Sequence, residues 1–162
     1  MFDLLPSDWG HLYTIGRLDA DSEGLILLTN DGDFCQKVAH PRHGMLKSYR
    51  VSLARRVAPE SLKTLTNGLR DDGEWLQAKS AKLLAANNTR SEVELVLAEG
   101  KNREIRRMFK ALGQRVLRLQ RISVGPVKLG ELPRGKWRVL SQAEIASCLR
   151  FCGKAQESHR RN

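Results

Sequence analysis

Residues 16–32 read GRLDADSEGLILLTNDG, and this stretch joins a group of carboxylates to an apolar run. Its acidic residues are Asp19, Asp21, Glu23 and Asp31. Four consecutive aliphatic residues at 25–28 lead into Asn30-Asp31-Gly32, which predicts a buried strand over 25–29 that ends in a turn. A solvated loop is the default interpretation of such acids, because ionised carboxylates are mostly exposed. The rest of the chain decides whether one of them has a function.

Composition describes a soluble globular protein. The chain has 162 residues, 41% of them hydrophobic and 28% charged, which is enough for one domain with a substantial core. No apolar run is long enough to span a bilayer, and no secretion signal precedes residue 10, so we expect a cytoplasmic protein. Cys35, Cys148 and Cys152 suit core packing rather than a metal site, and His40 and His43 have no second ligand cluster. We therefore expect no metal site.

The net charge of +10 is concentrated in one part of the chain. Residues 101–138 contain twelve Lys or Arg and two Asp or Glu, whereas the remainder carries sixteen of each sign. A field concentrated in this way suits a polyanion. An acidic membrane surface is the rival partner, but the segment lacks a basic amphipathic helix with a bulky aromatic face. The charge distribution therefore favours nucleic acid.

Hydrophobic periodicity predicts an α+β fold on a mixed, largely antiparallel sheet. The predicted strands cover 11–15, 25–29, 48–53, 75–84, 92–97, 116–120 and 136–140, with a hairpin turn at Asn87-Asn88. The predicted helices cover 33–39, 59–67 and 102–112, and a last helix begins at a Ser141/Glu144 capping box and runs to 152. Residues 1–152 thus form one domain, and we expect 153–162 to be a disordered polar tail.

The segment 102–112 has the clearest helical pattern. Its apolar residues recur at helical spacing on one side, and its basic residues do so on the opposite side. The apolar set is Ile105, Met108, Phe109 and Leu112, and the basic set is Arg103, Arg106, Arg107 and Lys110. From the residues alone, phosphate binding is the simplest role for these cations.

Three separated stretches resemble the RsuA/RluB-type ribosomal RNA pseudouridine synthases. They are GRLDADSEGLILLTNDG, KSYRV at 47–51, and EGKNREIRRM at 99–108 followed by RLQRISVGPVKLGELPRGKWRVL at 118–140. The segments stand in the family's order, and the resemblance covers residues 2–145. It implies an isomerase that converts a uridine of ribosomal RNA to pseudouridine. The reaction breaks the bond from ribose to the ring nitrogen and rejoins the base through carbon 5. It involves no net redox change or hydrolysis, so the resemblance implies that no cofactor is needed.

The resemblance also implies an active site. Asp19 matches the family's catalytic aspartate, which acts on the ribose or on the uracil ring. Arg106 matches the arginine that pairs with this aspartate, and such a cation would hold a partly buried carboxylate ionised. Tyr49 in KSYRV matches the tyrosine that packs on the target uracil, where stacking replaces contacts that a flipped base loses.

Further residues are expected to bind the substrate. Arg17 is similar to the family residue that helps to displace the flipped nucleotide, and Leu119 is our candidate for the apolar floor of the uracil pocket. Contacts to the RNA backbone are expected from Lys101, Arg103, Arg107 and Lys110. The other acids of the opening stretch keep the interpretation of turn and loop residues.

One difference from the family bears on function. Relatives carry a small RNA-binding domain and a further strand before their equivalent of FDLLP, and both are absent from this sequence, which we interpret as a fragment or a short form. An alternative therefore stays open, in which the chain is a non-catalytic RNA-binding or assembly module.

The NREIRRM and RLQR segments are more similar to large-subunit (23S) than to small-subunit enzymes. We expect a monomer whose partner is ribosomal RNA.

Overall fold

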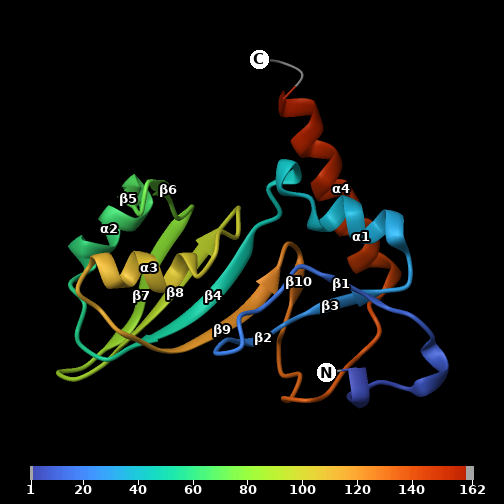
Figure 1. The fold of residues 1–162 in the computed structure, drawn as a ribbon, viewed down its shortest axis with the longest axis horizontal. Coiled ribbons are helices and arrows are strands. Elements are labelled where there is room, and N and C mark those ends of the chain that lie inside the picture. The colour runs from blue at the N-terminus through green and yellow to red at the C-terminus, as the bar shows by residue number, and fades with distance from the viewer. Residues whose placement is uncertain (1, 160–162) are drawn as a thin grey trace.

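The computed structural model describes residues 2–159, except for the side chains of residues 2, 41 and 153–159. Two groups of helices stand on the same side of a long, twisted sheet whose two halves have separate cores (Figure 1). The predicted α+β fold with a mixed, largely antiparallel sheet is confirmed. No helix in the described part of the chain is both long enough and apolar enough to cross a membrane.

Long antiparallel strands form the centre of the molecule. The main sheet has the order β10-β9-β4-β8-β7, and β2 pairs with β9 in parallel. The bounds of these strands are β2 Glu23–Gly24, β4 Lys47–Leu53, β7 Ser80–Ala86, β8 Ser91–Leu97, β9 Val116–Val124 and β10 Val127–Lys128. Strands β4 and β9 pair along almost their whole length and join the two halves of the fold.

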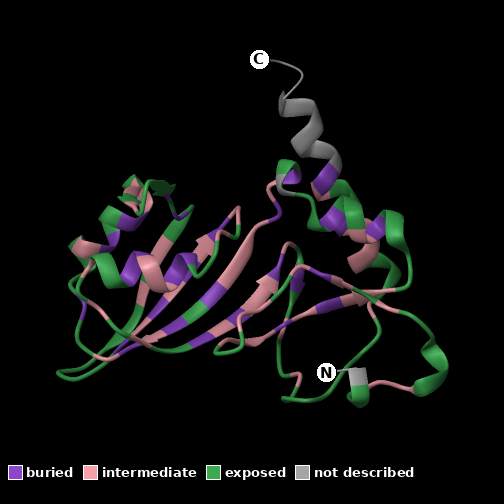
Figure 2. Ribbon diagram, in the orientation of Figure 1, coloured by how far each residue is buried: buried purple, intermediate pink, exposed green. Residues whose placement is uncertain are grey.

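The first half buries one face of the sheet under two helices. Helix α2 (Pro59–Asn67) contributes Leu62 and Leu65, and helix α3 (Glu104–Ala111) contributes Ile105, Met108 and Phe109. They pack on β8, whose residues alternate between buried and part-exposed positions (Figure 2), and on the buried residues of β4. Strand β7 contributes only part-buried residues to this core. A small hairpin of β5 (Leu69–Asp71) and β6 (Glu74–Leu76) closes this half.

The second half has its own core. Strands β1 (Tyr13–Ile15) and β3 (Leu27–Thr29) pair with each other, and helices α1 (Gly32–Ala39) and α4 (Gln142–His159) pack beside them. Cys148 and Cys152 are buried in this core, in agreement with their predicted packing role. The Ser141/Glu144 capping box is also confirmed, because each residue accepts a hydrogen bond from the backbone N–H of the other.

Three predicted strands differ from the structure. The stretch 25–29 is not one strand, because the chain turns at Gly24, whose φ is 108°. Residues before this turn pair with β9, and residues 27–29 pair with β1. The stretch 75–84 is divided between β6 and β7, which belong to different sheets. Residues 136–140 form no strand, and instead belong to an irregular connection between β10 and α4. The strand that would be needed is remote in the sequence for residues 23–24 and absent from the described structure for 136–140, whereas 75–84 is divided because β6 pairs with β5 and β7 pairs with β8.

The C-terminal prediction concerns residues that are only partly described. We expected the last helix to end at Cys152 and a disordered tail to cover 153–162. Helix α4 continues through His159, whereas residues 160–162 and the side chains of 153–159 lie outside the described residues.

Candidate active site

A cavity of about 480 Å³ lies between the two halves of the fold. Its volume falls in the usual range for small-molecule sites, about 300–1,000 Å³. The walls come from the loop after β1, from β4 and β9, and from the connection between β8 and α3. Six residues that the sequence analysis selected line it: Arg17, Asp19, Tyr49, Lys101, Arg103 and Leu119.

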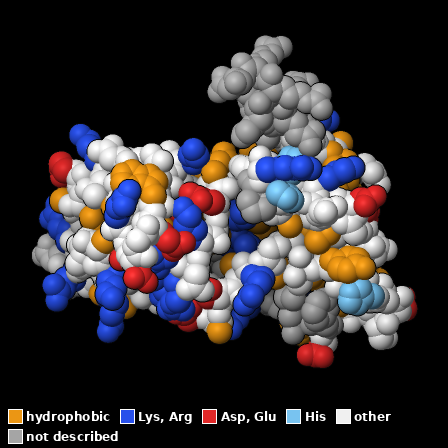
Figure 3. Space-filling view, turned by 45° about the horizontal axis from the view of Figure 1, so that its top comes forward, with side chains coloured by type: hydrophobic (Ala, Val, Ile, Leu, Met, Phe, Trp, Pro, Cys, Tyr) orange, Lys and Arg blue, Asp and Glu red, His pale blue; other side chains and the backbone are white. Residues whose placement is uncertain are grey.

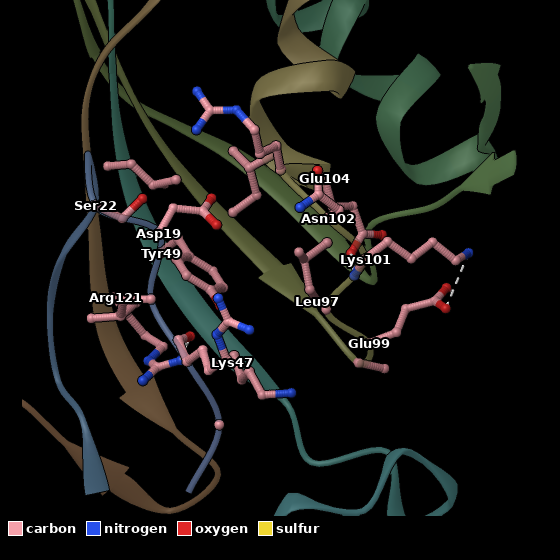
Figure 4. A pocket seen from close by; sticks show the side chains of 18 of the residues that line it. Asp19, Ser22, Lys47, Tyr49, Leu97, Glu99, Lys101, Asn102, Glu104 and Arg121 are labelled. Carbon is pink, nitrogen blue, oxygen red and sulfur yellow. Dashed lines mark hydrogen bonds and ion pairs between the residues drawn. The ribbon is translucent and has the colours of Figure 1, made fainter. Parts of the chain in front are cut away.

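Asp19 stands on a tight turn in the loop 16–22. The turn is closed by the backbone N–H of Ser22, which donates to the Asp19 carbonyl at 2.9 Å. Figure 4 shows the Asp19 carboxylate directed into the cavity next to the ring of Tyr49. No hydrogen bond or ion pair engages this carboxylate among the residues that the structure describes. Its oxygens are therefore free to act on a bound molecule.

Tyr49 forms part of the floor of the cavity, on strand β4. The side chain is buried, and burial raises the pKa of its hydroxyl above the ordinary value, while the nearby Arg121 guanidinium opposes this shift. Leu119 of β9 is also buried, in agreement with a role in an apolar floor. The two side chains give the cavity a surface on which a planar ring can rest.

The expected pairing of Asp19 with Arg106 is not formed, and this corrects the sequence analysis. The Arg106 side chain meets Asp21 instead, with Nε 3.2 Å from the Asp21 carboxylate and Nη2 donating to the Asp21 carbonyl at 2.6 Å. Arg103 donates to the same carboxylate at 2.8 Å and lowers the pKa of Asp21. Asp21, which we interpreted as a loop acid, therefore anchors the loop to helix α3.

The basic residues near helix α3 do not form the uniform RNA-facing row that their spacing suggested. Arg107 is mostly buried and binds Asp71 at 2.6 Å and also Glu74, so it fastens the β5–β6 hairpin to the helix. Lys101 pairs with Glu99 at 3.1 Å at the rim of the cavity. Lys110 is exposed and remains a candidate for an RNA contact.

Besides Glu99, which pairs with Lys101, three charged residues of the cavity were not selected from the sequence. Lys47 and Arg121 lie beside Tyr49 on β4 and β9, and Glu104 begins helix α3 (Figure 4). Glu104 is buried, and its Oε2 accepts from the Lys101 backbone N–H at 3.0 Å. Burial raises the pKa of Glu104. The signal for Lys47 was available, because alternation along KSYRV puts it on the same side of the strand as Tyr49.

Cations outnumber carboxylates around this cavity. Arg17, Lys47 and Arg121 have no carboxylate within ion-pair distance in the described part of the chain. The space-filling view shows Lys and Arg side chains along the hollow between the two halves (Figure 3). Among the described residues there is no group of three or more His, Cys, Asp or Glu side chains that could hold a metal ion. The arrangement suits an uncharged ring attached to an anionic backbone.

Comparisons with known proteins agree with this geometry. The family model described as "RNA pseudouridylate synthase" matches residues 5–111. The ribosomal large subunit pseudouridine synthase B of Bacillus subtilis is 41% identical over 138 residues, which are 83% of this chain and 56% of that protein. The ribosomal small subunit pseudouridine synthase A of Vibrio parahaemolyticus is 36% identical over 138 residues, which are 85% of this chain and 59% of that protein. The chain thus spans less than two thirds of either relative.

Solved structures give the same result. A protein described as a pseudouridylate synthase matches with a TM-score of 0.81 at 36% identity, over 91% of this chain and 64% of that one. The archaeal box H/ACA Nop10–Cbf5 complex matches with a TM-score of 0.56 at 15% identity, over 76% of this chain and 41% of that one. The second likeness is one of fold alone.

Proposed function

The chain belongs to the RNA pseudouridylate synthase family, and from this premise we propose that it isomerises a uridine of ribosomal RNA to pseudouridine with Asp19 as the catalytic carboxylate. The observation that carries the proposal is the unpaired Asp19 carboxylate, directed into a cavity beside the buried ring of Tyr49. A target uridine enters this cavity only after leaving its helix, and the Tyr49 ring then stacks on the uracil.

The reaction needs little beyond these groups. The bond from ribose C1′ to uracil N1 breaks, the base turns while it is held in the cavity, and C5 bonds to C1′. The proton on C5 is lost and N1 gains one, so the product has the composition of the substrate. Asp19 acts in the first step, Tyr49 and Leu119 hold the ring, and Arg17 at the rim occupies the space left by the everted nucleotide.

RNA binding is assigned to three of the basic residues rather than to all of them. Arg103 and Lys101 at the rim, with Lys110 on the outer side of α3, are proposed to contact phosphates. Arg106 and Arg107 are proposed to act indirectly, since their ion pairs hold the Asp19 loop and the β5–β6 hairpin on helix α3. We assign the target to 23S RNA, on the basis of the NREIRRM and RLQR segments.

The proposal is tested by isomerisation assays on 23S and 16S transcripts with the native chain and with Asp19→Asn. We expect pseudouridine in the 23S transcript from the native chain and none from Asp19→Asn, while both proteins bind the RNA equally. A matched control is Asp33→Asn, which changes an exposed carboxylate of helix α1 away from the cavity. An active Asp19→Asn protein would remove Asp19 from the mechanism.

A non-catalytic RNA-binding module is the second candidate. It is favoured by the excess positive charge in residues 101–138 and by the share of the relatives' length that the chain spans. RNA affinity without pseudouridine, both in this chain and in one extended to the length of its relatives, would support it. Turnover by the extended chain would exclude it.

A further inference from the structure

The floor of the cavity carries two cations that the proposed mechanism has not used. Tyr49 and Arg121 are directly opposite each other in the β4–β9 pairing, and Lys47 lies two residues before Tyr49 on β4. Opposite residues of an antiparallel pair have their side chains on the same face, and so do residues two apart on a strand. Lys47 and Arg121 therefore both lie beside the proposed uracil-binding ring, on the same face of the sheet (Figure 4).

Arg121 is a buried cation with a donor left over. Its side chain is 1% exposed, and the guanidinium donates from Nε to the Leu25 carbonyl at 2.7 Å and from Nη1 to the Arg17 carbonyl at 3.1 Å. Its Nη2 is buried without a hydrogen-bond partner of good geometry, and no carboxylate of the described chain pairs with the guanidinium. The Tyr49 hydroxyl is close enough for its interaction with Arg121 to lower the pKa of Tyr49. A buried charge that lacks a hydrogen-bond acceptor is costly in free energy, unless a ligand supplies that acceptor.

Lys47 is the second unpaired cation. Its side chain is part-buried and extends into the cavity, and no described carboxylate lies within ion-pair distance of its ammonium. Burial and the charge of Arg121 lower the pKa of Lys47, while Glu104 partly opposes them. The titratable and charged groups that line the cavity with Lys47 are Arg17, Asp19, His40, Tyr49, the Glu99–Lys101 pair, Arg103, Glu104 and Arg121.

We propose that Lys47 and Arg121 stabilise the uracil as an anion while its bond to ribose is broken. The inference rests on the proposed function. When the C1′–N1 bond breaks, the bonding electron pair stays on the uracil and spreads over N1 and the adjacent carbonyl oxygen. The Lys47 ammonium donates a hydrogen bond to the ring, and Arg121 supplies a fixed positive charge beneath it. When C5 has bonded to C1′ and lost its proton, and N1 has gained one, the ring is neutral again.

The arrangement is preorganised for this task. Groups aimed at charge that develops during a reaction are most effective when they are already fixed and shielded from water. Arg121 is fixed, because its two carbonyl partners, Arg17 and Leu25, lie before and after Asp19 in the chain. The carboxylate that acts on the nucleotide and the cation that receives the displaced charge are thus held by one network.

Turnover by lysine variants tests the proposal. We expect Lys47→Met to lower kcat by about 100-fold, as loss of one preorganised donor does, with KM little changed, and Lys47→Arg to keep most of the activity. The matched control Lys82→Met removes an exposed lysine from strand β7 of the same sheet and should leave kcat unchanged. Native kcat in Lys47→Met would overturn the proposal.

The pH dependence separates a cation from a base. Because the cation is the active form, the native rate should fall as pH rises through the pKa of Lys47, which lies below the ordinary lysine value. The fall should disappear in Lys47→Arg, whose guanidinium stays charged. A rate that rises through this range, with an inactive Lys47→Arg protein, would instead make Lys47 a general base and refute the proposal.

Binding of free pyrimidines tests the inference without turnover. Barbiturate is a planar pyrimidine that is an anion at pH 7, whereas uracil is neutral there. In chemical-shift titrations the native chain should bind barbiturate more tightly than uracil, and Lys47→Met should remove most of the difference. Equal affinities in the native chain would refute the anion site. Failure of the proposed function looks different, because the native chain would then prefer barbiturate but form no pseudouridine.

Discussion

Gly24 is the residue where a single methyl group should do most damage to both fold and site. A Cβ at this position would lie 2.3 Å from the Arg121 carbonyl oxygen, and the φ of 108° is one that other residues rarely adopt. The neighbour is backbone of a central strand, so it cannot move aside. Gly24→Ala must therefore push β2 away from β9.

The cost follows from the contacts that hold β2 in place. Leu25 N–H donates to the Arg121 carbonyl at 2.8 Å, and Arg121 Nε donates to the Leu25 carbonyl at 2.7 Å. A neutral hydrogen bond contributes about 0.5–1.5 kcal/mol, one to a charged group about 1.5–3, and positive-φ strain costs about 1–2. We expect Gly24→Ala to lower the free energy of unfolding by about 3–6 kcal/mol, a large share of a typical domain's stability.

Equilibrium urea unfolding followed by circular dichroism measures this loss. The matched control is Gly130→Ala, which has a positive φ of 56° but no atom within 4 Å of the added Cβ. It should lose only the strain, about 1 kcal/mol. If the two variants differ by less than 1 kcal/mol, close backbone contact is not what requires glycine at position 24.

Three further predictions concern single charged side chains. Glu104→Gln should raise the free energy of unfolding at pH 7 by about 1 kcal/mol in urea unfolding, because Gln keeps the hydrogen-bond acceptor and removes a buried charge. Burial raises the pKa of Glu104, so the gain should vanish below about pH 4, where the carboxyl is neutral in the folded and the unfolded protein. Arg107→Ala should lower the midpoint of urea unfolding without changing the salt dependence of RNA binding. Lys110→Ala should leave the unfolding midpoint unchanged and reduce the slope of log affinity against log salt by about 0.7. The hydrogen bonds from Arg138 lower the pKa of Glu144 to about 2. The protection of the first turn of α4 against hydrogen exchange should therefore be lost as pH falls from about 4.5 to 2, and in Glu144→Gln this protection should not depend on pH.

Local pattern was enough for the elements that depend on their own residues. The amphipathic spacing of 102–112 predicted α3 and its buried side chains, and Pro59 with Gly68 predicted both ends of α2. The alternation at Val93, Leu95 and Leu97 predicted the inward face of β8. In these segments the sequence periodicity and the tertiary burial agree, so no distant partner was needed.

Elements that depend on remote partners could not be predicted in this way. The run at 25–29 contains a change of sheet, which only the approach of β9 to Gly24 explains. Residues 136–140 alternate like a strand, but no neighbouring strand is available to pair with them in the described structure. A strand is defined by its partner, and alternation alone does not supply one.

The same reasoning applies to the candidate site. Residues that carry a family motif, such as Asp19 and Tyr49, were selected from the sequence and lie in one cavity. Arg121 was missed because an arginine is seldom buried, so its place on the same face of the strand as Leu119 was not weighed. Its position opposite Tyr49 in the β4–β9 pairing could not be known from RLQRISV alone.

The separation of Asp19 from Arg106 has a chemical consequence. A carboxylate held in a two-point ion pair must break that pair before its oxygens can reach a substrate. Asp21, two residues further along the loop, forms ion pairs with both Arg103 and Arg106. Helix α3 is thereby attached to the loop without an ion pair to the Asp19 carboxylate. Asp19 stays near positive charge, supplied by cavity cations that also face the substrate. One acid of the opening stretch therefore anchors the loop, and another is left free to react.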